Sequence, residues 1–116
     1  MKVIIAGSRT INDYLIVYNA IQQSNFDITE VISGGCRGPD LLAEQWAKEY
    51  NIPIKRFDAN WKKYGKSAGP IRNIDMILKG HAEALILIWD GKSPGSKNMK
   101  EQAKKYNLKI YEFIYK

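Results

Sequence analysis

The densest group of residues able to hold an anion is the segment 33–40, which reads SGGCRGPD. Three glycines fall within five residues there, and glycine lets backbone N–H groups approach a ligand closely. Pro39 and Asp40 are typical of the first turn of a helix, whose positive dipole end would face the same ligand. The segment contains neither G-x-G-x-x-G nor Gly-Lys-Ser/Thr, so it is not a dinucleotide fingerprint or a Walker loop. It predicts a phosphate cradle, with a tight structural turn as the alternative.

Three further segments have a similar make-up. Gly7-Ser8-Arg9 combines close backbone approach, a hydroxyl group and a guanidinium that can hold a phosphate, although an exposed turn explains it equally well. Residues 69–73, GPIRN, would open a helix, and an arginine in a first turn opposes the helix dipole unless an anion lies nearby. Residues 90–96, DGKSPGS, again place glycines and hydroxyl groups ahead of a helix.

Two acidic residues and the single cysteine belong to these segments. Asp40 would repel a phosphate, so we expect it to cap its helix, to bond a ribose hydroxyl or to hold a metal, with capping as the default. Asp90 is a second candidate for a ribose hydroxyl. Cys36 is interpreted as a small loop residue and not as a nucleophile, because no histidine or other base lies near it in the sequence.

The candidate segments sit between alternating strands and helices. Apolar runs predict strands at 2–6, 29–33, 53–57, 84–89 and 108–115, and helical periodicity fills the intervals between them. Such alternation implies parallel strands joined by right-handed crossovers. The predicted fold class is α/β, a single Rossmann-like three-layer domain with about five parallel strands in the order 3-2-1-4-5, flanked by helices. The strand at 84–89 is expected to be covered on both faces and the one at 108–115 to lie at an edge. The carboxyl ends of parallel strands share one edge, where such folds hold their ligands.

An aromatic and basic stretch precedes the helix expected at 69–79. Trp61 and Tyr64 are interspersed with Lys62, Lys63 and Lys66 in what the pattern predicts to be a loop. Aromatic rings in such a loop can stack on a nucleobase. They can also cover the sheet edge or a contact between subunits, which the sequence favours slightly.

Length and composition limit the class of protein. The 116 residues suit one domain, 1–116, and the net charge of +6 favours anionic partners such as nucleotides or nucleic acid. One cysteine excludes an internal disulfide and fits a reducing cytosol. One cysteine and one histidine cannot supply the ligands of a usual zinc site, and neither a metal nor a cofactor is expected. No apolar run approaches the roughly 18 residues of a membrane span and no signal peptide is evident, so we expect a cytoplasmic protein without membrane contact.

The chain resembles the SLOG superfamily in four segments that occur in the same order, at 7–9, 33–40, 69–73 and 90–96. This superfamily consists of Rossmann-like domains and includes the cytokinin-activating phosphoribohydrolases and the DNA-processing protein DprA. The likeness is greatest to small stand-alone YspA-like members and covers nearly the whole chain. It implies a nucleotide or nucleotide-derived ligand at the carboxyl edge, and assembly as a homodimer or higher homo-oligomer.

One position departs from the phosphoribohydrolase pattern. Those enzymes carry Gly-Gly-x-Gly-Thr-x-x-Glu after the central strand, and the glutamate serves N-glycosidic cleavage. When Gly95-Ser96 is aligned with the Gly-Thr of that motif, Met99 takes the place of the glutamate. A thioether cannot accept a proton, so this departure counts against that activity.

The leading hypothesis from the sequence is a non-catalytic domain that binds a nucleotide or nucleotide-derived small molecule in order to sense or sequester it. One alternative is an N-glycosidic hydrolase in which Asp40, Glu44 or Asp90 replaces the missing glutamate. Another is a single-stranded DNA-binding module like DprA. The expected ligand-binding residues are Gly7, Ser8, Arg9, Gly34, Gly35, Cys36, Arg37, Gly38, Asp40, Arg72, Asn73, Asp90, Gly91, Ser93, Gly95 and Ser96.

Overall fold

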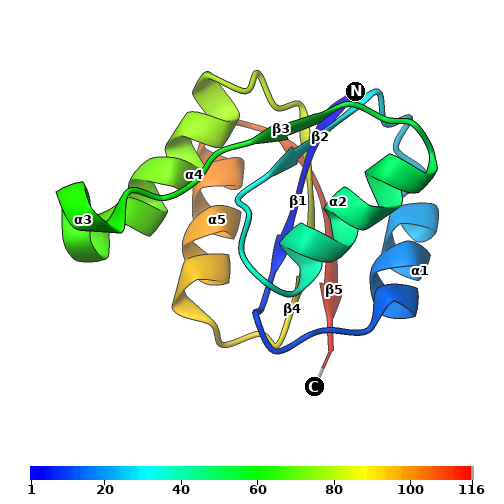
Figure 1. Cartoon of the computed structure of the whole chain (residues 1–116), viewed down its shortest axis with the longest axis horizontal. Coiled ribbons are helices and arrows are strands. Elements are labelled where there is room, and N and C mark those ends of the chain that lie inside the picture. Colours follow the sequence, from blue (N-terminus) through cyan, green and yellow to red (C-terminus); the bar gives the residue numbers. More distant parts are fainter. Residues whose placement is uncertain (116) are drawn as a thin grey trace.

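The computed structural model describes residues 1–115 and shows a five-stranded, all-parallel sheet with the strand order β3-β2-β1-β4-β5. Helices α1 and α2 cover one face of this sheet, and α4 and α5 cover the other (Figure 1). The predicted α/β class and strand order are confirmed. The strands are β1 (Lys2–Gly7), β2 (Glu30–Ser33), β3 (Ile54–Arg56), β4 (Ala84–Trp89) and β5 (Lys109–Ile114), and the four long helices are α1 (Tyr14–Ser24), α2 (Pro39–Glu49), α4 (Ala68–Leu78) and α5 (Pro94–Lys105).

Alternation along the strands explains the two packed layers. In β1, Val3 and Ile5 pack toward α1 and α2, whereas Ile4 and Ala6 pack toward α4 and α5. All six residues of β4 are buried, as predicted for a strand covered on both faces. Strand β5 lies at the edge of the sheet, which also confirms the prediction.

The helix starts are set by recognisable sequence signals. The side chain of Asp13 accepts a hydrogen bond from the N–H of Leu15 at 3.0 Å and so caps α1, and Pro39 is the first residue of α2. Each helix that follows a parallel strand begins at the carboxyl edge of the sheet. The starts of α2, α4 and α5 therefore gather beside the ends of the strands, and the candidate segments come together there.

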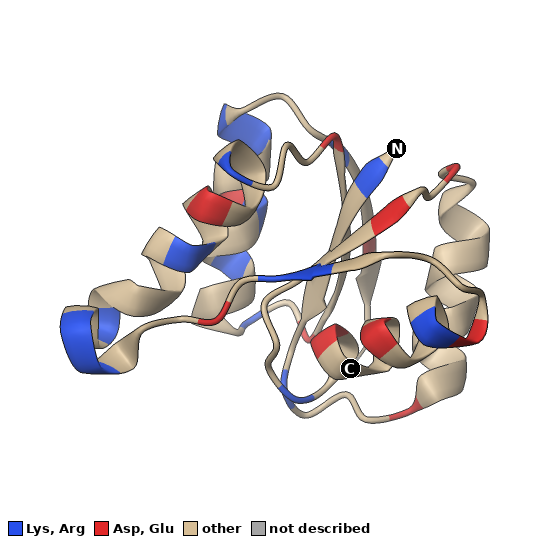
Figure 2. Cartoon of the chain, turned by 45° about the horizontal axis from the view of Figure 1, so that its top comes forward, with Lys and Arg blue, Asp and Glu red and all other residues tan. Residues whose placement is uncertain are grey.

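The stretch between β3 and α4 differs from the expected loop. Trp61–Tyr64 forms a short helix, α3, and a 3-10 turn, η1 (Gly65–Ser67), follows it. Asn60 caps α3, since its Oδ1 accepts a hydrogen bond from the N–H of Lys63 at 3.1 Å. Helix α3 stands away from the sheet and carries two lysines, Lys62 and Lys63 (Figures 1 and 2).

Candidate functional site

A cavity of about 500 Å³ lies at the carboxyl edge of the sheet, a volume within the roughly 300–1,000 Å³ typical of small-molecule sites. Its wall comes from the ends of β1 and β4, the loop before α2, helix α3 and the first turns of α4 and α5. The predicted ligand-binding residues in this wall are Gly7, Ser8, Arg9, Cys36, Asp40, Arg72, Asn73, Asp90, Ser93, Gly95 and Ser96. The others lie outside it: Gly34, Gly35, Arg37, Gly38 and Gly91.

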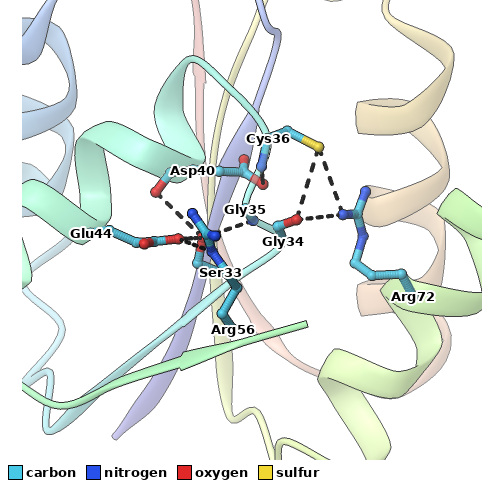
Figure 3. Close-up of polar contacts among 8 residues, drawn as sticks. All are labelled: Ser33, Gly34, Gly35, Cys36, Asp40, Glu44, Arg56 and Arg72. Carbon is cyan, nitrogen blue, oxygen red and sulfur yellow. Dashed lines mark hydrogen bonds and ion pairs between the residues drawn. The ribbon is translucent and has the colours of Figure 1, made fainter. Parts of the chain in front are cut away.

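The loop between β2 and α2, which was expected to cradle a phosphate, uses two of its N–H groups within the chain (Figure 3). The N–H of Gly35 donates to Ser33 Oγ at 3.0 Å, and that of Cys36 donates to Asp40 Oδ2 at 3.3 Å. Asp40 was expected to cap α2, but its carboxylate bonds the loop upstream of that helix. A Cβ on Gly34 would lie 2.6 Å from Arg72 Nη1 and 2.8 Å from Asp40 Oδ2. Gly34 therefore makes room for two charged side chains of the protein itself.

Glu44, one of the three predicted catalytic carboxylates, lies behind this loop and not in the cavity wall. Its Oε2 accepts hydrogen bonds from Ser33 Oγ at 2.7 Å and from Arg56 Nε at 3.0 Å (Figure 3). The contact with Arg56 is an ion pair with a largely buried glutamate. This arrangement gives Glu44 a structural task, which is to anchor the end of β2 and β3 against α2.

Asp40 is the buried carboxylate of the cavity wall, with only 4% of its surface exposed. Burial raises the pKa of its carboxyl from an ordinary value of 3.8 to about 6. The N–H of Cys36, the Arg72 guanidinium and the N–H of Gly34 oppose this rise in pKa, and the negative charge of Glu44 adds to it. Asp40 can therefore exchange a proton near neutral pH, as general acids and bases do.

Two arginines approach Cys36 from different elements. Arg72 donates from Nη1 to the carbonyl oxygen of Gly34 at 2.8 Å and to Cys36 Sγ at 3.7 Å, and Arg9 Nη2 lies 3.7 Å from the same sulfur. The expected dipole conflict of Arg72 is absent, because α4 begins at Ala68 and Arg72 falls in its second turn. Among the described residues, neither arginine has a carboxylate partner within 4.0 Å. Both therefore bring positive charge to the cavity without a direct ion pair, although the charge of Arg72 also acts on Asp40.

The loop between β4 and α5 is held by hydroxyl groups and one carboxylate. Asp90 Oδ1 accepts hydrogen bonds from the N–H of Lys92 at 2.8 Å, the N–H of Ser93 at 2.8 Å and the hydroxyl of Ser93 at 2.7 Å. These bonds, the backbone N–H of Lys92 first, lower the pKa of Asp90 well below its ordinary range. Because the Ser93 hydroxyl donates to Asp90, it accepts from Ser8 Oγ, 2.6 Å away. The network fixes the end of β1 against this loop and keeps Asp90 ionised.

The start of α5 is left open by this network. Ser93 precedes the helix but makes no side-chain cap bond in the described chain, because its hydroxyl faces Asp90. The N–H of Lys97 bonds the carbonyl of Ser93, so the first two available donors, the N–H groups of Gly95 and Ser96, have no partner inside the helix. Both residues line the cavity. The helix end thus presents free donors and its positive dipole end to a ligand.

Several residues of the wall were not predicted from the sequence as ligand-binding residues. Asn98 Oδ1 accepts a hydrogen bond from Asn73 Nδ2 at 3.0 Å and joins α5 to α4 across the cavity. Asn98 lies three residues after Gly95, so helical spacing was the signal that could have found it. Met99, expected in the core, is 1% exposed and yet contributes to the wall. The remaining unpredicted wall residues are Ala6, Thr10, Trp61, Lys66, Gly69, Pro70, Pro94 and Met76.

Two kinds of feature are absent from residues 1–115. No helix in this range is long and apolar enough to cross a membrane. Nor does this part of the chain gather three or more His, Cys, Asp or Glu side chains that could hold a metal ion.

The fold and the cavity together define a Rossmann-like α/β domain with a cavity at the carboxyl edge of its sheet. Residues 1–64 match the model of the YAcAr family, described as the YspA, cpYpsA-related SLOG family. The Gene 61 protein of Mycobacterium phage D29 is 31% identical over 121 residues, which cover 97% of this chain and 95% of that protein. The chain belongs to this SLOG family, which confirms the resemblance found in the sequence. Membership fits a nucleotide-related ligand-binding role.

Proposed function

We propose that the protein binds a nucleotide-derived small molecule whose phosphate lies at the start of α5. The observation that carries this proposal is that Gly95 and Ser96 line a cavity of about 500 Å³ while their N–H groups have no hydrogen-bond partner in the described chain. Donors at a helix start, combined with the helix dipole, favour a phosphate group. The Gly34–Gly38 loop, which the sequence predicts to be a phosphate cradle, contributes only Cys36 to the wall of this cavity, so we place the phosphate at the start of α5 instead.

The charged residues around the cavity support the same ligand. Arg9 is exposed at the rim, and Arg72 is held by Gly34 with its guanidinium in the wall. Both are free of carboxylate partners within 4.0 Å in the described chain, so an anionic ligand can take that place. A sensing or sequestering role follows if the ligand is bound and released unchanged.

Isothermal titration tests this proposal with inorganic phosphate, ribose 5-phosphate and the nucleoside monophosphates AMP, GMP, CMP and UMP. We expect at least one phosphate ester to bind, and Arg9→Ala to weaken that binding by about tenfold, as for a lost charge-assisted hydrogen bond. Arg37→Ala is the matched control, because Arg37 is exposed on a neighbouring loop outside the cavity wall. Absence of binding by the whole panel, or equal effects of the two arginine variants, would contradict the proposal.

A second candidate function, hydrolysis of an N-glycosidic bond, is favoured by the buried Asp40 carboxyl in the wall. In this reaction water adds to C1′ of the ribose, the C1′–N bond breaks, and the electron pair of that bond leaves with the base. Protonated Asp40 would give its proton to the leaving base and recover one from the attacking water, so the products are free base and ribose 5-phosphate. Chromatography of nucleoside monophosphates after incubation tests this: base release that Asp40→Asn abolishes supports hydrolysis, and no release supports binding alone.

Two expectations from the sequence remain proposals about partners. Single-stranded DNA binding would lose affinity steeply as salt rises, because phosphate contacts release counterions. A titration of an oligonucleotide at several salt concentrations distinguishes it from small-molecule binding. Assembly as a homodimer or higher homo-oligomer is tested by light scattering at several protein concentrations.

A further inference from the structure

Helix α3 places one of its two aromatic side chains in the cavity wall. Trp61 lines the cavity and is 50% exposed, whereas Tyr64, 40% exposed, lies outside the wall. The other two tryptophans, Trp46 and Trp89, are each 6% exposed within the core. An indole exposed at a cavity offers a flat apolar face, together with one N–H donor, to a ligand or a partner.

Local hydrogen bonds hold the backbone of α3, which carries the indole. Asn60 caps the helix through the N–H of Lys63, and the N–H of Gly65 bonds the carbonyl of Trp61. The outer edge of the ring lies against the start of α4, since a Cβ on Gly69 would be 3.5 Å from Trp61 Cη2. Gly69 carries no side chain, so α4 leaves the space beside the indole ring open at this position.

One face of α4 runs from the indole to the floor of the cavity. Gly69, Arg72, Asn73 and Met76 all line it, at the i, i+3, i+4 and i+7 spacing of one helix face. Seven residues of α-helix span roughly 10 Å, about the length of a nucleoside. Met76 is 1% exposed and supplies an apolar floor. Along α4 the wall therefore changes from aromatic, through charged and amide groups, to apolar.

This chemistry separates the cavity into two parts. Hydroxyl and backbone N–H donors, together with the positive charge of Arg9, lie at the ends of β1 and β4 and at the start of α5, whereas Trp61 and Pro70 give the wall at α3 and α4 an apolar surface. Lys66 lies in the wall near that surface. A ligand that carries a phosphate on one side and a flat aromatic ring on the other matches both parts.

We propose that Trp61 stacks on the nucleobase of the ligand and so determines that the site takes nucleotides in preference to sugar phosphates. This inference rests on the proposed function, because the phosphate is assumed to lie at the start of α5. Stacking of a base on an aromatic side chain is sequence-tolerant, so Trp61 selects for the presence of a base and not for its identity.

Isothermal titration of a nucleoside monophosphate against ribose 5-phosphate tests the inference, since the two ligands differ by the base alone. The wild-type protein is expected to bind the nucleotide about tenfold or more tightly than ribose 5-phosphate. Trp61→Ala removes this preference and leaves the affinity for ribose 5-phosphate within about twofold, and Trp61→Phe retains most of the preference. Tyr64→Ala is the matched control, an aromatic truncation on the same short helix but outside the wall, and should change neither affinity.

The outcomes separate this inference from the function on which it rests. If ribose 5-phosphate binds the wild-type protein but the base adds nothing, or if Trp61→Ala keeps the preference, stacking is overturned and phosphate binding stands. If Trp61→Ala weakens both ligands equally, Trp61 acts through the fold of the site and stacking is again overturned. If neither ligand binds the wild-type protein, both proposals fail.

Fluorescence gives a second measurement that does not depend on a variant. Trp61 is the exposed one of the three tryptophans, so acrylamide quenches mainly its emission. A nucleoside monophosphate at saturating concentration is expected to protect it from acrylamide, whereas ribose 5-phosphate does not. Equal protection by the two ligands, or none by either, contradicts stacking.

Discussion

The loop before α2 and the loop before α5 look alike in sequence but are built in opposite ways. Both combine glycines, a hydroxyl residue, a proline at the helix start and an aspartate. Before α2, Asp40 folds back and occupies the N–H of Cys36, and its burial raises the pKa of its carboxyl. Before α5, Asp90 holds the N–H groups ahead of the helix, and those of Gly95 and Ser96 are left for a ligand.

The difference teaches that a glycine-rich loop at a helix start can serve the protein or its ligand. Gly38 adopts φ +91° and packs against the backbone of Ser8, so it allows two loops to approach each other. Around Gly95, no atom of the described chain lies within 4 Å of the point that a Cβ would occupy. Packing therefore requires glycine at position 38, whereas Gly95 leaves open space at the start of α5. Substitutions that exchange these properties test whether the contrast is real.

The largest effect is expected from Gly38→Ala. A Cβ there would lie 2.8 Å from the carbonyl oxygen of Ser8 and 3.1 Å from Cα of Arg9. These are backbone atoms that cannot move aside, and the backbone angle is itself costly for a residue with a side chain. We expect the free energy of unfolding, measured in urea, to fall by on the order of 3–4 kcal/mol.

Gly95→Ala is the matched control for this change. Its Cβ would meet no atom of the described chain, and alanine is favoured over glycine inside a helix by roughly 1 kcal/mol. Stability is therefore expected to stay level or to rise slightly. Similar losses of stability at both positions would mean that the two loops are packed alike.

The two aspartates should respond to pH with opposite signs. The folded pKa of Asp40, about 6, exceeds its ordinary 3.8, so the folded state holds a proton that the unfolded state has already lost. The stabilisation that the Asp40 carboxyl contributes is fully present below pH 3.8 and is lost as the pH rises through 6. Relative to Asp40→Asn, the wild-type protein should lose up to about 3 kcal/mol of unfolding free energy over that range, as measured by urea denaturation.

For Asp90 the sign reverses, because its folded pKa is lowered from the ordinary 3.8. Its contribution is present above pH 3.8 and is lost as the pH falls further. Relative to Asp90→Asn, the wild-type protein should therefore lose stability on acidification. If both variants change the pH profile in the same direction, the proposed electrostatic contrast between the loops is wrong.

Gly95→Asp should make the second loop resemble the first. A carboxylate at this position enters open space at the positive end of α5, which favours it by roughly 0.3–1 kcal/mol, so the fold is retained. It would compete with a phosphate for the N–H groups of Gly95 and Ser96. We expect about tenfold or greater loss of affinity for ribose 5-phosphate by isothermal titration. Unchanged affinity would place the phosphate elsewhere in the cavity.

The fold could be predicted because its signals are long and repeated. Apolar runs alternated with helical periodicity along the chain, and parallel strands then required one shared carboxyl edge. Helix α3 could not be predicted, since four residues carry too little periodicity, and its main signal is the cap that Asn60 provides. The position of Arg72 within its helix was also misjudged, because α4 begins at Ala68 and not at Gly69.

The location of the site was predicted better than the task of each group in it. Sequence spacing placed Ser8, Asp40 and Ser93 at one edge, and the cavity includes all three. Which N–H groups stay free depends on where each side chain turns: Asp40 toward Cys36, and the Ser93 hydroxyl toward Asp90. These choices among hydrogen-bond partners arise from three-dimensional packing, and neighbouring sequence does not specify them.

The smallest expected effect comes from Ser93→Ala, and it tests whether the start of α5 is open. Ser93 precedes the helix without capping it, so alanine removes only the hydroxyl contacts with Asp90 and Ser8. Ser93 is half-buried, and water can replace its hydroxyl, so the loss should be about 1 kcal/mol or less in urea denaturation. A serine that did cap the helix could cost up to about 2 kcal/mol on the same change. A loss of that size would mean that the N–H groups at the start of α5 are satisfied from within, as those of Gly35 and Cys36 before α2 are, and the contrast between the loops would disappear.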